Sequence, residues 1–242
     1  VGGQVLLLPG FVWAVIRAGS AWFQLARGDS RADAPNAILL LAAWWLAHLT
    51  LYALRLPVTY QHGRYQMPVI VALVIVGVCG SVQVLDRVTY PVVHRVACRA
   101  GVLAAGLLFA AFLVIGARAY ATDVGFVHGE MVTTAHWLAE NTPDHSLIAA
   151  HDIGAVGYSA QRRLLDLAGL VTPEVVPIIR DDVALMALMQ SRHVDYVVFF
   201  PDWSDAYRRL AGDPRLQAVY STNYVWTRQA GHANMTVYRL QP

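Results

Sequence analysis

Charge is scarce in this 242-residue chain, and lysine is absent from it. Charged residues make up 14% of the sequence and hydrophobic residues 57%, whereas an ordinary soluble domain has about 25% and about 45–50%. The composition excludes a disordered protein and indicates a chain that is part membrane and part globular. All 18 basic residues are arginines, so the chain cannot contain a P-loop, which needs a lysine. The only two cysteines, Cys79 and Cys98, have no metal-ligand spacing.

The few charges that are present divide the chain into two halves. Residues 1–122 carry nine arginines against three carboxylates, and residues 123–242 carry nine arginines against thirteen carboxylates. In the basic half the arginines interrupt apolar runs and do not gather with aromatics on a soluble face, so we expect no nucleic-acid partner. We predict a transmembrane helical region over 1–122 and a small extracytoplasmic α/β domain over 123–242.

Long apolar runs fill the first half. Three runs reach the length of about 20 residues that a membrane-spanning helix needs, and a weaker fourth run, 5–23, is interrupted by Pro9 and Arg17. The three runs cover residues 34–54, 67–85 and 97–119. The link between the last two holds Arg87, His94, Arg95 and Arg99 against the single acid Asp86. This bias predicts a cytoplasmic link, so residues 55–65 and everything after Tyr120 should face outward.

The outward link carries a basic and aromatic cluster where the run 67–85 begins. Its members are Tyr60, His62, Arg64 and Tyr65. A guanidinium beside aromatic rings at the depth of the lipid headgroups can hold a phosphate through two hydrogen bonds, which predicts a site for a lipid-linked phosphate. Tyrosine belts and arginine anchors also occur at membrane interfaces without any ligand, so both interpretations stay open.

The second half alternates helical and strand patterns. Strand patterns cover residues 146–150, 163–167, 194–200, 216–221 and 235–240. Strands separated by helices predict an α/β layer fold with a mostly parallel sheet. No helical pattern separates the last two strands, so we expect these two to form an antiparallel edge.

Polar segments follow the first two predicted strands and form the candidate pocket of this domain. The pocket residues are His151, Asp152, Gly154, Gly157, Tyr158 and Asp166. The two glycines lack the first glycine of a dinucleotide fingerprint, and a tight turn explains them equally well. Asp166 could accept a ligand hydroxyl or cap the following turn. No other histidine or cysteine lies at ligand spacing from His151, so we expect no metal site, and the sequence gives no catalytic constellation.

Three stretches together resemble a known family. They are Tyr60–Pro68 (YQHGRYQMP), Ala150–Tyr158 (AHDIGAVGY) and Leu165–Glu174 (LDLAGLVTPE). They resemble bacterial GT-C-type membrane glycosyltransferases, the family 39 relatives of protein mannosyltransferases and aminoarabinose transferases, and the resemblance extends from about Leu39 to Leu240.

The resemblance implies a multi-pass enzyme of the bacterial cytoplasmic membrane that moves a sugar from a polyprenyl-phosphate donor to an acceptor on the outer face. In that family the catalytic base is an acidic residue of the first outward loop, and dependence on a divalent metal varies. Nothing in this chain matches that loop. We therefore expect the chain to be the C-terminal part of a longer protein, with no cofactor of its own and the base upstream of Val1.

Two other functions remain as alternatives. The chain could be a non-catalytic, membrane-anchored module whose α/β domain binds an external ligand at the carboxyl ends of its strands. It could also be a scaffold that positions partner proteins.

Overall fold

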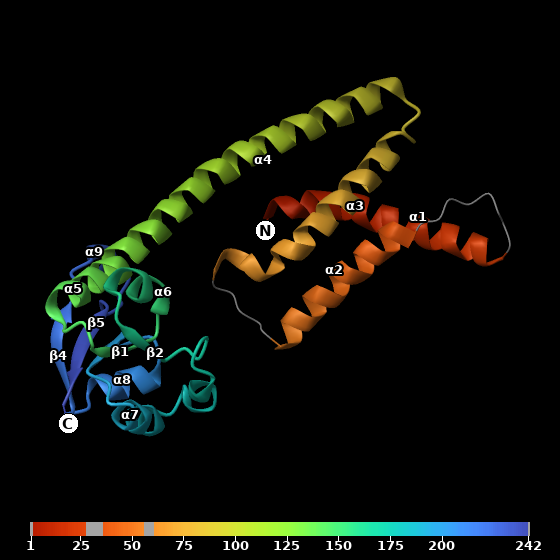
Figure 1. Cartoon of the computed structure of the whole chain (residues 1–242). Helices are drawn as coiled ribbons and strands as arrows, with labels where there is room; N and C mark the ends of the chain where they lie inside the picture. The colour runs from red at the N-terminus through yellow and green to blue at the C-terminus, as the bar shows by residue number, and fades with distance from the viewer. Residues whose placement is uncertain (1, 28–35, 56–60, 242) are drawn as a thin grey trace. The chain divides into compact units, whose positions relative to one another are not determined.

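The computed structural model describes residues 2–27, 36–55 and 61–241 (Figure 1). The chain forms two compact units, Val1–Leu113 and Val114–Pro242. The longest helix, α4 (Pro91–Phe126), runs through the boundary between them. The predicted boundary at 122/123 also falls within this helix.

The described residues of the first unit form helices, with short turns at Arg27 and at residues 86–90. Before α4 it contains η1 (Gly2–Leu7), α1 (Leu8–Ala26), α2 (Asn36–Arg55), η2 (Gln61–Gln66) and α3 (Met67–Leu85). Four helices are long and apolar enough to cross a membrane, which confirms the predicted long apolar helices. Pro9 does not interrupt α1, because it lies in the first turn, where its missing N–H is not needed.

Small residues bring α1 and α3 into backbone contact. A Cβ atom added to Gly80 would overlap the carbonyl oxygen of Gly10, and one added to Gly10 would overlap the hydroxyl of Ser81. Ala14 is buried beside them. Glycine and alanine at a helix crossing allow the close approach that is typical of helix pairs in membranes.

The second unit contains five strands and the helices that cover them. The strands are β1 (Leu147–Ala150), β2 (Arg163–Asp166), β3 (Tyr196–Phe199), β4 (Leu216–Ser221) and β5 (Thr236–Leu240). The helical elements after α4 are η3 (Val127–Val132), α5 (Thr133–Asn141), α6 (Ile153–Ala155), η4 (Val156–Ala160), η5 (Pro173–Ile178), α7 (Asp182–Ser191), α8 (Asp205–Ala211) and α9 (Val225–Gln229).

The sheet is mixed, and the predicted parallel arrangement is found in its β2-β1-β3 part. Its order is β2-β1-β3-β5-β4. Pairs β1–β2 and β1–β3 are parallel, whereas β5 is antiparallel to both β3 and β4. The last two strands are antiparallel as predicted, but β5 lies inside the sheet. After α8, β4 takes the outer position, and β5 returns through the short segment around α9 to fill the space beside β3.

Alternate side chains of the strands supply two cores. Ala149, Val197 and Phe199 pack with buried residues of α7 and α8 on one face. Ile148 and Val198 pack with α5 and η4 on the other face. This two-faced burial explains why the central strand reads as a continuous apolar run and does not alternate.

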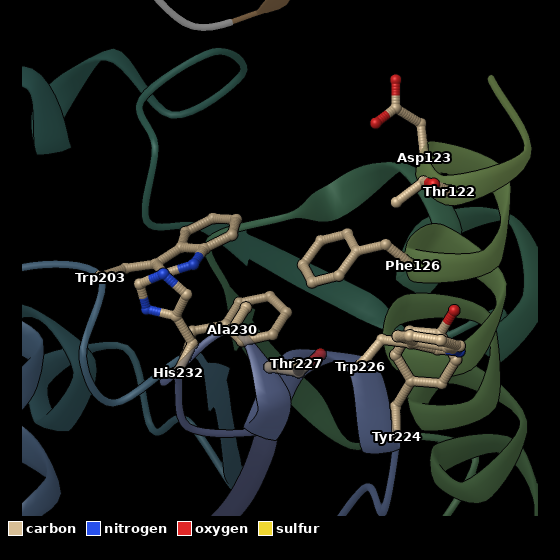
Figure 2. A pocket seen from close by; sticks show the side chains of 10 residues that line it. Thr122, Asp123, Phe126, Trp203, Tyr224, Trp226, Thr227, Ala230 and His232 are labelled. Carbon is tan, nitrogen blue, oxygen red and sulfur yellow. The ribbon is translucent and has the colours of Figure 1, made fainter. Parts of the chain in front are cut away.

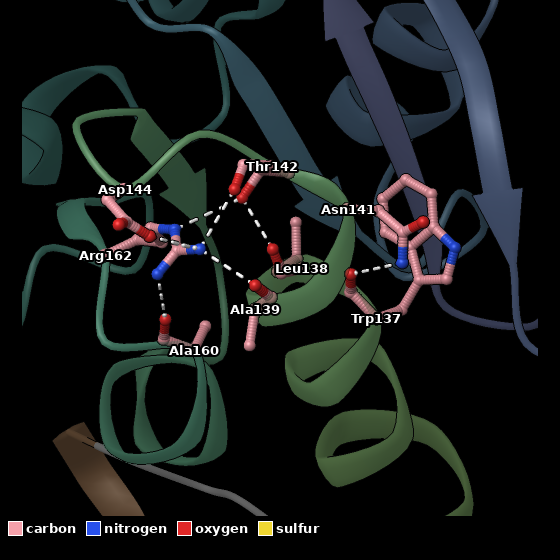
Figure 3. A network of polar contacts seen from close by, with 8 residues as sticks. All are labelled: Trp137, Leu138, Ala139, Asn141, Thr142, Asp144, Ala160 and Arg162. Atoms are coloured by element: carbon pink, nitrogen blue, oxygen red, sulfur yellow. Dashed lines mark hydrogen bonds and ion pairs between the residues drawn. The ribbon is translucent and has the colours of Figure 1, made fainter.

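Arg162 fastens the covering helix α5 to the segment before β2 (Figure 3). Its guanidinium donates to the carbonyl oxygens of Ala139 and Thr142 at 2.9 Å and of Ala160 at 3.0 Å. It also pairs with Asp144 at 3.0 Å, although its own side chain is only 8% exposed. The buried cation thereby satisfies carbonyls at the C-terminal end of α5, which no helical N–H can reach.

Candidate functional site

Three of the four predicted phosphate-binding residues, His62, Arg64 and Tyr65, lie just before α3, in η2. Arg64 donates to the Tyr65 hydroxyl at 3.0 Å, and its guanidinium carbon lies 5.0 Å from the centroid of the Tyr65 ring. The Tyr65 carbonyl oxygen accepts a hydrogen bond of 2.8 Å from His48 Nε2 on α2. The Tyr52 ring is stacked with the rings of both His48 and Tyr65, at centroid distances of 4.6 and 5.7 Å. Aromatic stacking and one hydrogen bond thus fix the segment that carries Arg64.

Carboxylates are scarce around Arg64 in the part of the first unit that the structure describes. The described residues of the first unit include a single carboxylate, Asp86, which follows α3 at the end opposite to Arg64. The structure therefore brings Arg64 and Tyr65 together with His48 and Tyr52. Of the other two predicted members, Tyr60 lies outside the described residues, and His62 lies in η2.

In the second unit, His151 and Asp152 follow β1 at the carboxyl edge of the parallel strands, where ligands bind in open α/β sheets. His151 Nδ1 lies 2.9 Å from the hydroxyl of Tyr207 on α8, and its ring meets Trp203 edge-on at 5.3 Å between centroids. Asp152 Oδ2 is buried and has no hydrogen-bond partner among the described residues. Buried polar atoms without partners are rare and often mark functional positions.

Burial perturbs the ionisation of this group. It lowers the pKa of His151 below 6.5, although the carboxyls of Asp152 and Asp166 act in the opposite direction. Burial also raises the pKa of Asp152, opposed by His151, and the pKa of Tyr207. The lowered pKa favours the neutral imidazole, whose Nδ1, when unprotonated, can accept the hydrogen bond from Tyr207.

Asp166 is committed to the turn after β2. Its two carboxylate oxygens accept the backbone N–H groups of Ala168 and Val171 at 2.7 and 2.8 Å. The remaining predicted pocket residues lie in the short helical segment after Asp152. Gly154 belongs to α6, Gly157 and Tyr158 belong to η4, and the Tyr158 side chain is exposed. We find no phosphate cradle in this segment, because its glycines are in ordinary helical turns and do not have positive φ.

A pocket that the sequence analysis did not predict opens beside the same sheet edge (Figure 2). It has a volume of about 290 Å³. Its walls come from the end of α4, the segment after β3, and α9 with its flanking residues. Phe126, Phe200, Trp203, Tyr224, Trp226 and His232 are its ring-bearing residues. Figure 2 shows Trp203 and His232 on one side, Tyr224 and Trp226 on the other, and Phe126 with Thr227 between them.

Two glycines position Tyr224 in this wall. A Cβ atom on Gly129 would overlap the Tyr224 ring, and one on Gly125 would lie 2.6 Å from its hydroxyl oxygen. Buried Glu130 fastens the same turn, since its carboxylate accepts hydrogen bonds from the Met235 N–H at 3.0 Å and the Asn234 amide at 2.6 Å. The end of α4 is thereby held against the β4–β5 connection.

The pocket residues lie in three segments far apart in the sequence, which is why no motif identified them. The signal available in the sequence was the presence of Trp203 and Trp226 in the polar half, outside any strand pattern. In the structure these two side chains are 42% and 66% exposed. Within the described ranges, no three His, Cys, Asp or Glu side chains gather where they could hold a metal ion.

Comparison with known proteins identifies a family for this chain. No curated protein matches the chain. The sequence profile of one family matches residues 115–238, a stretch that almost coincides with the second unit and includes the last part of α4. The chain thus belongs to the family described as Domain of unknown function (DUF8728).

Proposed function

We propose that the chain is the C-terminal part of a membrane glycosyltransferase that takes a sugar from a polyprenyl-phosphate donor on the outer face of the membrane. The apolar surface of its helices supports a membrane location. No residue of α2 or α4 is buried, and Leu40 and Phe109 are each 72% exposed. Exposure of so much apolar surface to water is unfavourable, whereas the hydrocarbon core of a lipid bilayer would cover this surface.

Charge supports an orientation for these helices. Arg87, Arg95 and Arg99 lie close to the turn between α3 and α4, accompanied by one acid, Asp86. A short link rich in arginine stays in the cytoplasm. The start of α3, with Arg64, then faces outward, and the α/β domain is extracytoplasmic.

The observation that carries the proposal is the guanidinium of Arg64, which lies against the ring and the hydroxyl of Tyr65 at the start of an apolar helix. A donor of this class presents one phosphate at the depth of the headgroups. Arg64 would hold a phosphate by paired hydrogen bonds, and the Tyr65 hydroxyl would supply a further donor. The catalytic base would come from upstream of this chain, and the acceptor would be any hydroxyl compound that reaches the outer face.

Donor binding tests this proposal directly. The full-length protein in nanodiscs is titrated with a short-chain polyprenyl-phosphate sugar, with Arg64→Ala beside the wild type. Arg118→Ala serves as the matched control, because Arg118 is an exposed arginine on another apolar helix. We expect saturable binding that Arg64→Ala weakens by about tenfold to a hundredfold, which equals about 1.4–2.8 kcal/mol, and that the control leaves unchanged. Equal affinity in all three proteins would refute the assignment of the site.

A second function, a membrane-anchored ligand-binding module without catalysis, is favoured by the sheet edge. The unpartnered Asp152 and the neighbouring pocket are features of a binding site and need no transfer reaction. Transfer of sugar to any acceptor by the full-length protein would decide for the enzyme. Ligand binding without transfer and without donor affinity would decide for the module.

A further inference from the structure

We infer that the pocket between the end of α4, the segment after β3 and α9 binds a neutral sugar ring. All the residues that form it belong to the second unit. The inference does not rest on the proposed transfer reaction, because Arg64 belongs to the first unit and binding to each site is measured separately.

The aromatic walls are the first support. Five aromatic residues line a cavity of about 290 Å³, at the small end of the range for small-molecule sites. Phe200 lies between Phe126 and Trp203, stacked on both with centroid distances of 5.5 and 4.4 Å, which makes this wall rigid. On the other side the Trp226 ring remains 66% exposed. Flat, preformed apolar faces suit the C–H face of a sugar ring, which covers them without a change in the fold.

An unpartnered hydroxyl is the second support. Thr227 is only 4% exposed and lines the pocket, and its Oγ1 has no hydrogen-bond partner among the described residues. Figure 2 shows this hydroxyl beneath Phe126, between His232 and the Tyr224–Trp226 side. A buried hydroxyl without a partner costs free energy, and a ligand that offers hydroxyl groups recovers it.

His232 supplies a second polar group, on the Trp203 side of the pocket. Its Nδ1 pairs with Asp202 Oδ2 at 2.9 Å, and the same oxygen accepts the N–H of Ala233 at 3.1 Å. The imidazole is thereby fixed in position, with its Nε2 left for a ligand. A ring with hydroxyl groups on its edge and C–H groups on its face would use both kinds of wall at once.

The same residues argue against two other ligand classes. Among the described residues that line the pocket there is no arginine, and the one carboxylate, Asp123, would repel a phosphate. An aromatic cage also suits a quaternary ammonium ion. Such an ion has no hydrogen-bonding group, however, and would leave the Thr227 hydroxyl unsatisfied. A neutral polyhydroxylated ring satisfies both the aromatic faces and this hydroxyl.

The test measures binding of free sugars to the full chain in nanodiscs by saturation-transfer NMR and tryptophan fluorescence. The panel contains neutral hexoses and pentoses with their methyl glycosides, and choline and inorganic phosphate are probed beside them. Trp226→Ala removes one aromatic face, and Thr227→Val removes the hydroxyl while nearly keeping the shape. Tyr90→Ala is the control, since Tyr90 is an exposed aromatic outside the pocket, with 73% of its surface accessible against 66% for Trp226.

We expect saturable binding of at least one sugar, weakened about tenfold by Trp226→Ala and by Thr227→Val and unchanged by Tyr90→Ala. Loss of binding in Thr227→Val is informative, because a valine at a site where the hydroxyl has no partner should not unfold the domain. Binding of choline alone, binding of phosphate alone, or no binding of any sugar would overturn the inference. Each of these results would leave the donor site at Arg64 to be judged by its own titration.

Discussion

The hydroxyl of Tyr207 on α8 lies 2.9 Å from Nδ1 of His151, the first residue after β1. This contact joins two elements that are distant in the sequence at the carboxyl edge of the sheet. Trp203, which meets the His151 ring edge-on, is also a wall of the aromatic pocket. Trp203 therefore contacts the ionisable side chain of His151 and also lines the aromatic pocket.

The lowered pKa of His151 predicts a pH dependence of stability. Above about pH 6.5 the imidazole is neutral in both the folded and the unfolded chain. Below that value the unfolded chain takes up a proton more readily than the buried side chain does, so acidification destabilises the fold. We expect the melting temperature to fall between about pH 7 and about pH 5.5, and to fall less in His151→Gln. An identical pH profile in the two proteins would show that His151 is not buried as described.

Asp152 offers an independent check of the same group. Its carboxyl raises the pKa of His151 against the effect of burial, so Asp152→Asn should lower that pKa further. Titration of the His151 ring signals by NMR measures the change. An increase in this pKa would contradict the arrangement.

Gly129 is expected to be indispensable for the position of Tyr224. In Gly129→Ala the added methyl group would overlap the Tyr224 ring, and overpacking of this kind costs about 1–3 kcal/mol. Gly116→Ala on the preceding helix α4 is the control, because a Cβ atom there meets nothing within 4 Å. Thermal unfolding of both variants should show a loss of stability in the first one only. Equal stability would mean that Tyr224 is not seated on this turn.

Arg162 should be more sensitive to substitution than its neighbour Arg163. Arg162→Lys keeps the charge but lacks the planar guanidinium that reaches three carbonyl oxygens at once. The carbonyls left unpaired should lower the free energy of unfolding by about 2–3 kcal/mol. Arg163→Lys, at an exposed position of β2, should change stability by less than about 0.5 kcal/mol. Unfolding of the two variants in parallel measures the difference, and similar values would contradict the network in Figure 3.

The sequence alone predicted those features that depend on local pattern. The run 67–85 is long and apolar, and α3 (Met67–Leu85) has the same bounds. The run YVVF was expected to be a strand, and it forms β3 with three of its four residues buried. The parallel pairs also follow from helices lying between β1, β2 and β3.

The features that the sequence missed depend on long-range packing. β5 lies between β3 and β4, because β4 occupies the outer edge of the sheet. No local sequence pattern predicts this strand order. Phe126, Trp203 and Thr227 meet only because the end of α4 packs against the β4–β5 connection. The sequence allowed two roles for Asp166, binding a ligand hydroxyl or capping the following turn. Only the structure shows that its carboxylate accepts hydrogen bonds from Ala168 and Val171.

The measurement that tests the central claim most directly is native mass spectrometry of the full-length protein released from its own membrane. The account predicts an adduct with the mass of a polyprenyl phosphate or its sugar conjugate on the wild type and on Arg118→Ala, and its loss from Arg64→Ala. An adduct retained equally by Arg64→Ala, or no polyprenyl adduct on any of the three proteins, would contradict a donor site at the start of α3.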